Sequence, residues 1–314
     1  MKISVSVLKR FLTYVEIKTK ITSVFPFLMT LAYLNSSGLL INHTRSLIFF
    51  FGMFFFDLTA TTINNYYDSR KNGQKLPFSR RVSAVIMLIL LLLSVFFGIW
   101  LAMLTDIVVL FLGVLCFLFG IFYSFGPLPI SHGPYGEFIS GLFYGFLIPA
   151  ILLYINTPEG LLFSATLTGG ASGTLTLRFG IRNIIALLLL SAVPFCLTAN
   201  IMLANNICDL GRDEAVNRYT LPHYIKGHAV RLFAVLYYIS YLSVIVMVKM
   251  RFLSPLSLLL LITAIPVQKN INLFRKKQIK EETFIVSIKN FITIITVHIV
   301  LIVAGGFLPG WGPT

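Results

Sequence analysis

The chain has 314 residues, of which 57% are hydrophobic and 11% carry a charge. A soluble domain carries about 25% charged residues, so this composition excludes an ordinary soluble globular protein. The net charge of +14 gathers in loops between apolar segments and needs no nucleic-acid partner to explain it. The sequence therefore predicts an all-α polytopic membrane protein in contact with lipid.

Apolar runs of membrane-spanning length recur along the chain and predict about nine transmembrane helices. These expected spans centre on residues 21–41, 47–66, 83–103, 107–125, 138–156, 183–205, 228–249, 252–268 and 288–308.

Basic residues fall unevenly between the two sides of these spans. With nine spans, 20 of the 25 lysines and arginines lie in segments 2–20, 70–81, 212–231 and 269–289, all on one side. The other side holds Arg45, Arg178, Arg182, Lys249 and Arg251. The positive-inside rule then predicts a cell-membrane protein with a cytoplasmic amino terminus and an external carboxyl terminus.

The second expected span ends in Asn-Asn-Tyr-Tyr-Asp at 64–68, and the sixth ends in a similar motif, Asn-Asn-Ile-Cys-Asp, at 205–209. The second motif continues to Asp213, so Asn205, Asp209 and Asp213 share one face of a helix. A single carboxylate at a helix end is often only a cap or an interfacial charge. Two copies favour a site for a metal or polar ligand that opens to the cytoplasm.

Hard cations such as Mg²⁺ take oxygen ligands, usually a few carboxylates together with substrate phosphates. We therefore predict that a divalent metal and a diphosphate-bearing substrate bind at five residues, namely Asn64, Asp68, Asn205, Asp209 and Asp213.

Asp57 lies seven residues before Asn64, on the same face of the second span. A carboxylate inside a membrane is costly and is a functional hypothesis by default. Its depth places it too far from the helix end to share the metal directly. The pattern leaves a role in the site and a structural hydrogen bond equally open.

Three prolines and three glycines between Tyr123 and Glu137 exclude a regular helix there. Such a segment is tolerated at a membrane surface where it lines a cavity. Tyr123 is then expected at the cavity mouth and Glu137 at the entry to the fifth span. The structural alternatives are an aromatic-belt tyrosine and a charge at a helix amino terminus.

The repeated motif suggests one domain, 1–314, built from halves at about 15–130 and 135–270 with a final helix at 288–308. Segments 66–81 and 206–228 mix charges with aromatics and are expected to cap a membrane cavity with short helices. Segment 156–180, rich in Gly, Ser and Thr, is expected to be a solvated connection without chemistry. Gly141 and Gly145 form a G-x-x-x-G pair that permits close helix packing.

Three segments carry a resemblance: N-N-Y-Y-D at 64–68, Y-S-F-G-P-L-P-I with G-P-Y-G-E at 123–137, and N-N-I-C-D-L-G-R-D with R-Y-T-L-P at 205–222. Together they resemble the UbiA superfamily of intramembrane aromatic prenyltransferases, from about residue 18 to the last helix. The G-P-x-P-I segment is most similar to the branch that prenylates 1,4-dihydroxy-2-naphthoate. The 4-hydroxybenzoate branch is expected to carry a basic residue after that tyrosine.

The resemblance implies nine helices around a central cavity with a cytoplasmic cap. It also implies Mg²⁺-dependent transfer of a polyprenyl chain from polyprenyl diphosphate to 1,4-dihydroxy-2-naphthoate, with loss of diphosphate and CO2, in menaquinone biosynthesis. Asn64 and Asp68 would hold one Mg²⁺, and Asn205, Asp209 and Asp213 a second. Those three aspartates would be catalytic together with Tyr123, which would stabilise an allylic cation or orient the diphosphate.

Substrate-binding roles carried over from the resemblance fall on Asn64, Asn205, Glu137 and four basic residues, Lys18, Lys75, Arg80 and Arg218. Lys18 and Arg218 match the family's basic positions best. One departure is Asn72-Gly73-Gln74, where the family usually has a further acidic residue. The first metal site is then weaker, borrows Asp57, or belongs to a divergent subgroup.

Other functions stay open on the sequence alone. One is a UbiA-type enzyme with another aromatic acceptor, and another is a secondary transporter, in which repeated halves and polar residues within spans are also common. A phosphoalcohol transferase would show D-G and A-R spacings that these motifs do not have.

Overall fold

Helices make up most of the chain in a computed structural model, which describes residues 2–71, 75–124, 129–158, 161–168 and 173–308. The α-helices are α1 (Lys2–Tyr14), α2 (Ile21–Ser36), α3 (His43–Lys71), α4 (Arg80–Leu104), α5 (Ile107–Ser124), α6 (Gly136–Ser140), α7 (Ile148–Asn156), α8 (Ile181–Ala215), α9 (Leu221–Ile225), α10 (His228–Lys249), α11 (Ala264–Lys276) and α12 (Ile285–Gly306). Two strands, β1 (Phe163–Thr168) and β2 (Thr174–Phe179), complete the fold with three 3₁₀ segments (Ile17–Lys20, Ile130–His132 and Pro255–Thr263) and a π-helical segment (Gly141–Leu147).

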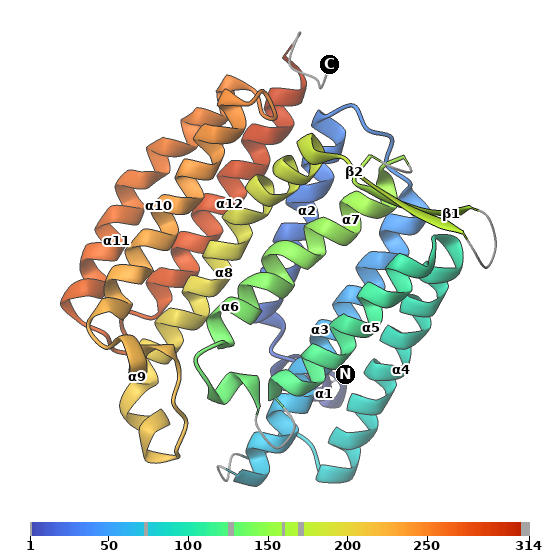
Figure 1. The fold of residues 1–314 in the computed structure, drawn as a ribbon. Helices are drawn as coiled ribbons and strands as arrows, with labels where there is room; N and C mark the ends of the chain where they lie inside the picture. The colour runs from blue at the N-terminus through green and yellow to red at the C-terminus, as the bar shows by residue number, and fades with distance from the viewer. Residues whose placement is uncertain (1, 72–74, 125–128, 159–160, 169–172, 309–314) are drawn as a thin grey trace.

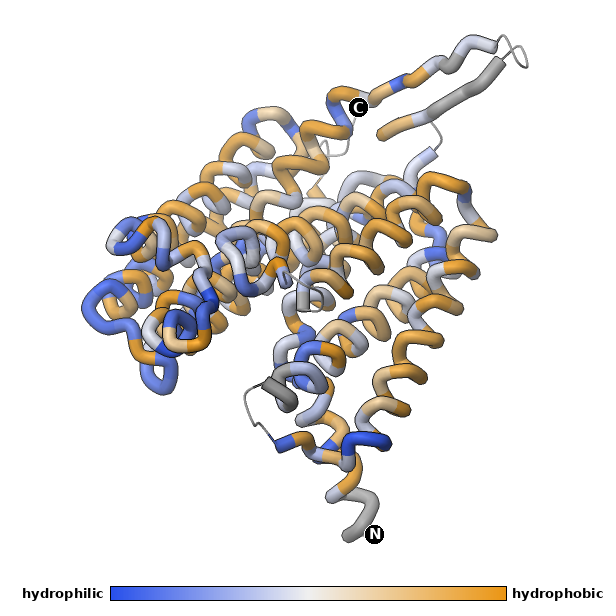
Figure 2. Tube along the Cα trace, turned by 60° about the horizontal axis from the view of Figure 1, so that its bottom comes forward, coloured by the Kyte–Doolittle hydropathy of each residue, from blue (hydrophilic) through white to orange (hydrophobic). Residues whose placement is uncertain are grey.

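Seven helices of the described chain are long and apolar enough to cross a membrane. They include α3, α4, α8, α10 and α12, together with the continuous helices 136–156 and 255–276. The apolar part of α5 is shorter, and α2 has 16 residues. Hydrophobic positions run along these helices, whereas hydrophilic residues gather at their ends and connections (Figure 2). The chain is therefore an all-α multi-pass membrane protein, as its composition predicts.

The helices form two groups with the helix 136–156 between them (Figure 1). α2, α8, α10, α11 and α12 form one group, and α3, α4 and α5 form the other. The largest hydrophobic core joins α2, α7, α8, α10 and α12. The ends of α3 and α8 that carry the Asn/Asp motifs lie at the same end of the bundle, opposite the carboxyl terminus (Figure 1).

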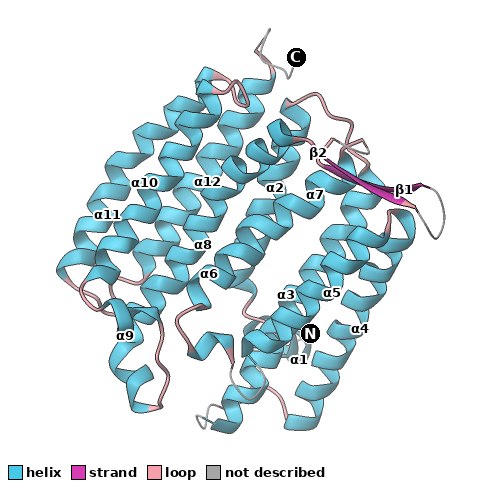
Figure 3. Ribbon diagram, in the orientation of Figure 1, coloured by secondary structure: helices cyan, strands magenta, loops and turns pink. Residues whose placement is uncertain are grey.

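The segment 156–180, expected to be a solvated connection, contains an antiparallel hairpin of β1 and β2 (Figure 3). Phe163 pairs with Phe179, and Ser164 with Arg178. The Gly, Ser and Thr content suggests a loop, but Phe163, Ala165 and Leu167 alternate with Ser and Thr at the period of a strand. At the opposite end, α3 and α8 continue into the expected cap as far as Lys71 and Ala215, and α9 is a short helix within it.

Gly145 lies where the helix 136–156 crosses α8. A Cβ atom at this position would overlap the backbone of Phe195, and one at Gly141 would lie 3.0 Å from the Phe195 carbonyl oxygen. Both glycines therefore permit the close packing that the G-x-x-x-G pattern predicts.

Replacing Gly145 with alanine is expected to lower the free energy of unfolding by about 1–3 kcal/mol, the range typical of overpacking. The added Cβ would overlap backbone atoms of Phe195, which cannot rotate away as a side chain can. Thermal unfolding in detergent measures the effect. The matched control is Gly211→Ala in α8, where an added Cβ meets nothing within 4 Å. Equal melting temperatures for the two variants would contradict this account of the packing.

Candidate active site

An apolar cavity of about 230 Å³ lies between α3, α4 and α5 and the helix 136–156. Four glycines in its wall, Gly52, Gly98, Gly113 and Gly120, leave room for it. Phenylalanine rings supply much of the remaining surface, from Phe49, Phe56, Phe97, Phe117 and Phe143. The cavity can therefore hold an apolar chain or ring and exclude water.

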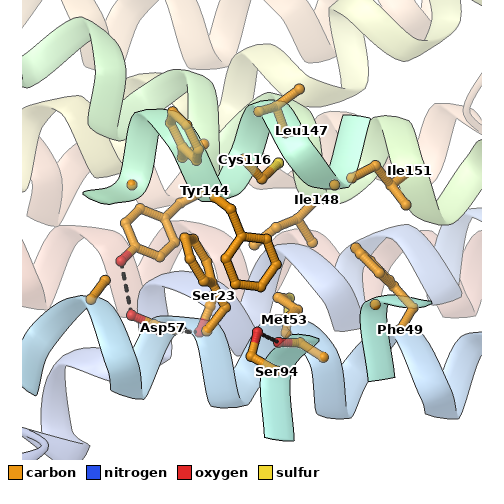
Figure 4. Close-up of a pocket in the computed structure, with 18 of the residues that line it drawn as sticks. Ser23, Phe49, Met53, Asp57, Ser94, Cys116, Tyr144, Leu147, Ile148 and Ile151 are labelled. Atoms are coloured by element: carbon orange, nitrogen blue, oxygen red, sulfur yellow. Dashed lines mark hydrogen bonds between the residues drawn. The ribbon is translucent and has the colours of Figure 1, made fainter. Parts of the chain in front are cut away.

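Polar groups enter the wall of this cavity at Asp57, Ser23 and Tyr144 (Figure 4). Asp57 is only 4% exposed and forms a 2.8 Å ion pair between its Oδ1 and the Nζ of Lys20. The hydroxyl of Tyr144 also donates to Oδ1 at 2.8 Å, and that of Ser23 donates to Oδ2 at 2.6 Å. These partners favour a structural role for Asp57 over coordination of a metal by its carboxylate.

Tyr123 lies in the wall of the cavity near the end of α5. Its hydroxyl is 3.2 Å from the hydroxyl of Ser140 and 3.7 Å from the sulfur of Met202. The phenol thus joins α5 to α6 and α8 and points into the molecule. This position agrees with the prediction of a tyrosine at a cavity and not with a lipid-facing aromatic belt.

The second Asn/Asp motif lies on the last turns of α8. Asp209, whose side chain is 13% exposed, pairs with Lys280 and lies 3.9 Å from a guanidinium nitrogen of Arg212. Lys280 comes from the connection between α11 and α12. The carboxylate is therefore partly buried and surrounded by cations.

Asp213 is one turn further along α8 and is 6% exposed. Its Oδ1 lies 3.6 Å from Arg218, whose Nε donates to the carbonyl of Ser131 at 3.1 Å. Arg218 therefore connects the second motif to the irregular segment before α6. This contact agrees with the predicted basic role of Arg218.

Glu137 begins α6, as expected, and is 4% exposed. Its Oε1 accepts a hydrogen bond from Nδ2 of Asn206 at 2.9 Å. Asn206 is the buried neighbour of the predicted ligand Asn205, which is half-buried. Glu137 and the second motif are thus directly joined by a hydrogen bond.

The first motif, at the end of α3, makes contacts of a different kind. Nδ2 of Asn65 donates to the carbonyl of Tyr14 at 3.0 Å and to Glu16 at 3.1 Å. The guanidinium of Arg80 lies 4.4 Å from the centre of the Tyr66 ring. Asn64 is half-buried. The side chain of Asp68 and residues 72–74, including Asn72 and Gln74, lie outside the described part of the structure.

Lys18 and Lys75 have exposed side chains at the end of the bundle that carries the motifs. Lys20, two residues after Lys18, is instead buried against Asp57. The basic residues that the structure places against motif side chains include Arg80, Arg212, Arg218 and Lys280.

The donor atoms of the second motif suit a hard cation. Among the described residues, no three His, Cys, Asp or Glu side chains cluster closely enough to hold a metal by themselves. Yet three buried oxygens there have no hydrogen-bond partner: Oδ2 of Asp213, Oδ1 of Asn206 and Oε2 of Glu137. Oxygens of this kind are the ligands that Mg²⁺ takes, and substrate phosphates complete its coordination.

Sequence reasoning missed Asn206, Lys280 and Tyr144 as members of this region. Asn206 carried a usable signal, since it belongs to the repeated Asn-Asn pair. Lys280 is 71 residues from Asp209, and Tyr144 is 87 residues from Asp57, so no local pattern links them.

Comparison with known proteins supports the family resemblance seen in the sequence motifs. The profile of the UbiA prenyltransferase family matches residues 23–295. A structure of a UbiA homologue from Archaeoglobus fulgidus bound to GPP and Mg²⁺ is similar with a TM-score of 0.61 and 14% identity, covering 95% of this chain and all of that one. No curated protein sequence matches the chain.

Two further solved structures share the fold. A digeranylgeranylglyceryl phosphate synthase has a TM-score of 0.59 and 19% identity, with 95% of this chain and 98% of that chain covered. The apo structure of a UbiA homologue from Aeropyrum pernix K1 has a TM-score of 0.57 and 14% identity, with 90% and 96% covered.

Proposed function

This chain belongs to the UbiA prenyltransferase family, and on that premise we propose that it transfers a polyprenyl chain from polyprenyl diphosphate to 1,4-dihydroxy-2-naphthoate. The bond between the prenyl C1 and the diphosphate oxygen breaks, and a carbon–carbon bond to the ring forms. The ring carboxylate leaves as CO2, which gives demethylmenaquinol for menaquinone biosynthesis. The observation that carries the proposal is the Asn/Asp motif of α8 at the same end of the bundle as the carboxyl end of α5, which carries Tyr123.

The motif residues would hold Mg²⁺ and the diphosphate together. Asn64 and Asp68 would hold one ion, and Asn205, Asp209 and Asp213 another. The metal, when bound, supplies positive charge against the leaving diphosphate. Arg218 and Lys280 already lie beside the second motif and supply further cations for the developing charge.

Two structures of a homologue support the metal and the donor. The A. fulgidus homologue has been seen with GPP and Mg²⁺ and with DMAPP and Mg²⁺. Their identities to this chain are low, so what they contribute directly is the fold. The family and the buried oxygens of Asp213, Asn206 and Glu137 support extending the ligands to this chain.

The apolar cavity would receive the prenyl tail, with Tyr123 near its reacting end. Aromatic faces stabilise a nearby allylic cation, and a dry cavity protects that cation from water. The G-P-x-P-I segment after Tyr123 supports naphthoate as the acceptor. The site would open to the cytoplasm, with the amino terminus inside and the carboxyl terminus outside, because most basic residues gather at that end.

Replacing Gly113 with phenylalanine is expected to shift donor preference towards shorter prenyl chains. Gly113 lines the cavity, and an added Cβ meets nothing within 4 Å, so the new ring projects into the space proposed for the tail. A change of pocket shape of this size is worth about 10–200-fold in kcat/KM between long and short donors. The control is Val114→Phe on the same helix, whose side chain is 48% exposed. An unchanged preference in Gly113→Phe would place the tail elsewhere.

The test of the function is turnover by detergent-purified protein given 1,4-dihydroxy-2-naphthoate and a labelled long-chain prenyl diphosphate, with Mg²⁺ or with EDTA. We expect prenylated naphthoquinol and labelled CO2 from carboxyl-labelled acceptor only when metal is present. Product from 4-hydroxybenzoate instead would contradict the acceptor and keep the reaction class. No product from either acceptor by folded protein would contradict both.

A further inference from the structure

A second cavity, of about 360 Å³, lies at the opposite end of the bundle from the Asn/Asp motifs. It is enclosed by the ends of α2, α7 and α12, the start of α8 and the segment 251–257 that follows α10. These ends lie together beside the carboxyl terminus in Figure 1. The proposed prenyl transfer uses no residue of this cavity.

The charged residues that line the second cavity in the described structure are Arg182 and Arg251, and none of its lining residues is acidic. Both arginines are exposed, and the guanidinium of Arg182 lies 5.0 Å from the centre of the Phe252 ring. Arg251 has a positive φ of 60°, an uncommon conformation for a residue other than glycine. Two arginines thus line one cavity.

Two membrane helices also begin there. α8 starts at Ile181, and the continuous helix 255–276 starts at Pro255. Neither has an acidic residue in its first turn, and α8 carries Arg182 there. Helix amino termini attract anions and disfavour cations, so an arginine at this place adds to an uncompensated positive potential.

Two buried hydroxyls complete the lining. Ser254 and Ser257 are 6% and 0% exposed, and both Oγ atoms lack a hydrogen-bond partner. A buried hydroxyl without a partner lowers the stability of the fold. An anionic oxygen in the cavity would provide an acceptor for it. Ser254 precedes the helix that begins at Pro255 but does not cap it.

We propose that the second cavity binds a phosphate group between Arg182, Arg251 and the hydroxyls of Ser254 and Ser257. The group comes from the head of an anionic phospholipid or from inorganic phosphate, and the chemistry of recognition is the same for both. Apolar residues such as Leu153, Leu187 and Ile302 line the rest of the cavity and would contact the glycerol and acyl portion of a lipid.

The test compares delipidated, detergent-purified protein with the double variant Arg182→Gln/Arg251→Gln. Binding is measured by the thermal shift on titration with phosphatidylglycerol, phosphatidylcholine or inorganic phosphate. The double variant loses both charge-assisted contacts proposed for the phosphate, so it should bind phosphatidylglycerol more weakly by about a hundredfold. The control, Arg178→Gln, removes an exposed arginine of β2 that does not line the cavity and should bind as wild type.

A shift with phosphatidylglycerol alone supports the site with a lipid ligand, and a shift with both anions supports it with phosphate as the minimal ligand. No shift with either anion, an equal shift with phosphatidylcholine, or an equal loss in Arg178→Gln would overturn the proposal. The variant Ser257→Ala separates a loss of binding from a loss of folding. It should leave the ligand-free melting temperature unchanged or higher, because it removes an unpaired hydroxyl, and yet weaken phosphatidylglycerol binding. Undiminished binding by Ser257→Ala would also count against the site.

Discussion

Replacing Asp209 with asparagine is expected to lower kcat about 10²–10³-fold, a loss typical of removing one group that stabilises transition-state charge. Asp209 is partly buried between Lys280 and Arg212 and lies at the centre of the helical face that also carries Asn205 and Asp213. The amide keeps the shape of the side chain but removes the negative charge that would hold Mg²⁺. Turnover of labelled prenyl diphosphate at several Mg²⁺ concentrations measures the loss.

The matched control is Asp106→Asn. Asp106 precedes α5 at the other end of the bundle, where it accepts a hydrogen bond from Tyr154. This variant should keep most of its activity per folded molecule. If Asp209→Asn kept more than half of the wild-type kcat with the same Mg²⁺ dependence, the second motif would not be the metal site.

Replacing Lys20 with methionine is expected to destabilise the protein by about 3–5 kcal/mol, because it leaves the carboxylate of Asp57 buried without its counter-ion. Both side chains of this pair are 4% exposed, so water cannot replace the lost partner. The melting temperature in detergent should therefore fall by several degrees. The same change at Lys277, whose pair with Glu282 is half-exposed, should cost no more than about 1 kcal/mol.

The double variant Lys20→Met/Asp57→Asn separates charge from packing. Asparagine needs no counter-ion, and its Oδ1 can accept from Tyr144 while its Nδ2 donates to the hydroxyl oxygen of Ser23, so the double variant should regain much of the stability lost in Lys20→Met. If instead the two losses simply added, the ion pair would not be what stabilises this part of the cavity wall.

Features that depend on neighbours in sequence were predictable. The helical period placed Asn205, Asp209 and Asp213 on one helix, and α8 carries all three. Small residues four apart predicted close packing at Gly141 and Gly145, and the structure shows α8 as the helix that packs there. The concentration of proline and glycine after Tyr123 predicted the break before α6, where the described residues hold only a short 3₁₀ segment.

Features that depend on distant parts of the chain were not predictable. Lys20 and Asp57 lie 37 residues apart, and either could be matched with many other charges by spacing alone. The hairpin of β1 and β2 was a local feature that composition concealed, because glycine and threonine content outweighed the alternation of apolar residues. The number of spans remains a prediction, since α2 and α5 are shorter than the other membrane helices.

α8 is longer than a bilayer requires. Its 35 residues extend roughly 52 Å, whereas the hydrocarbon core is about 30 Å thick. A bilayer whose hydrocarbon core began at Arg182 would end before the turns that carry Asp209 and Asp213. A diphosphate held there, as proposed, would stay in the hydrated headgroup layer while its tail would occupy the apolar cavity of the protein. The enzyme would thus keep the charged part of an amphiphilic substrate in a polar layer and its apolar part in an apolar one, as the membrane does. The diphosphate would never have to enter the hydrocarbon core.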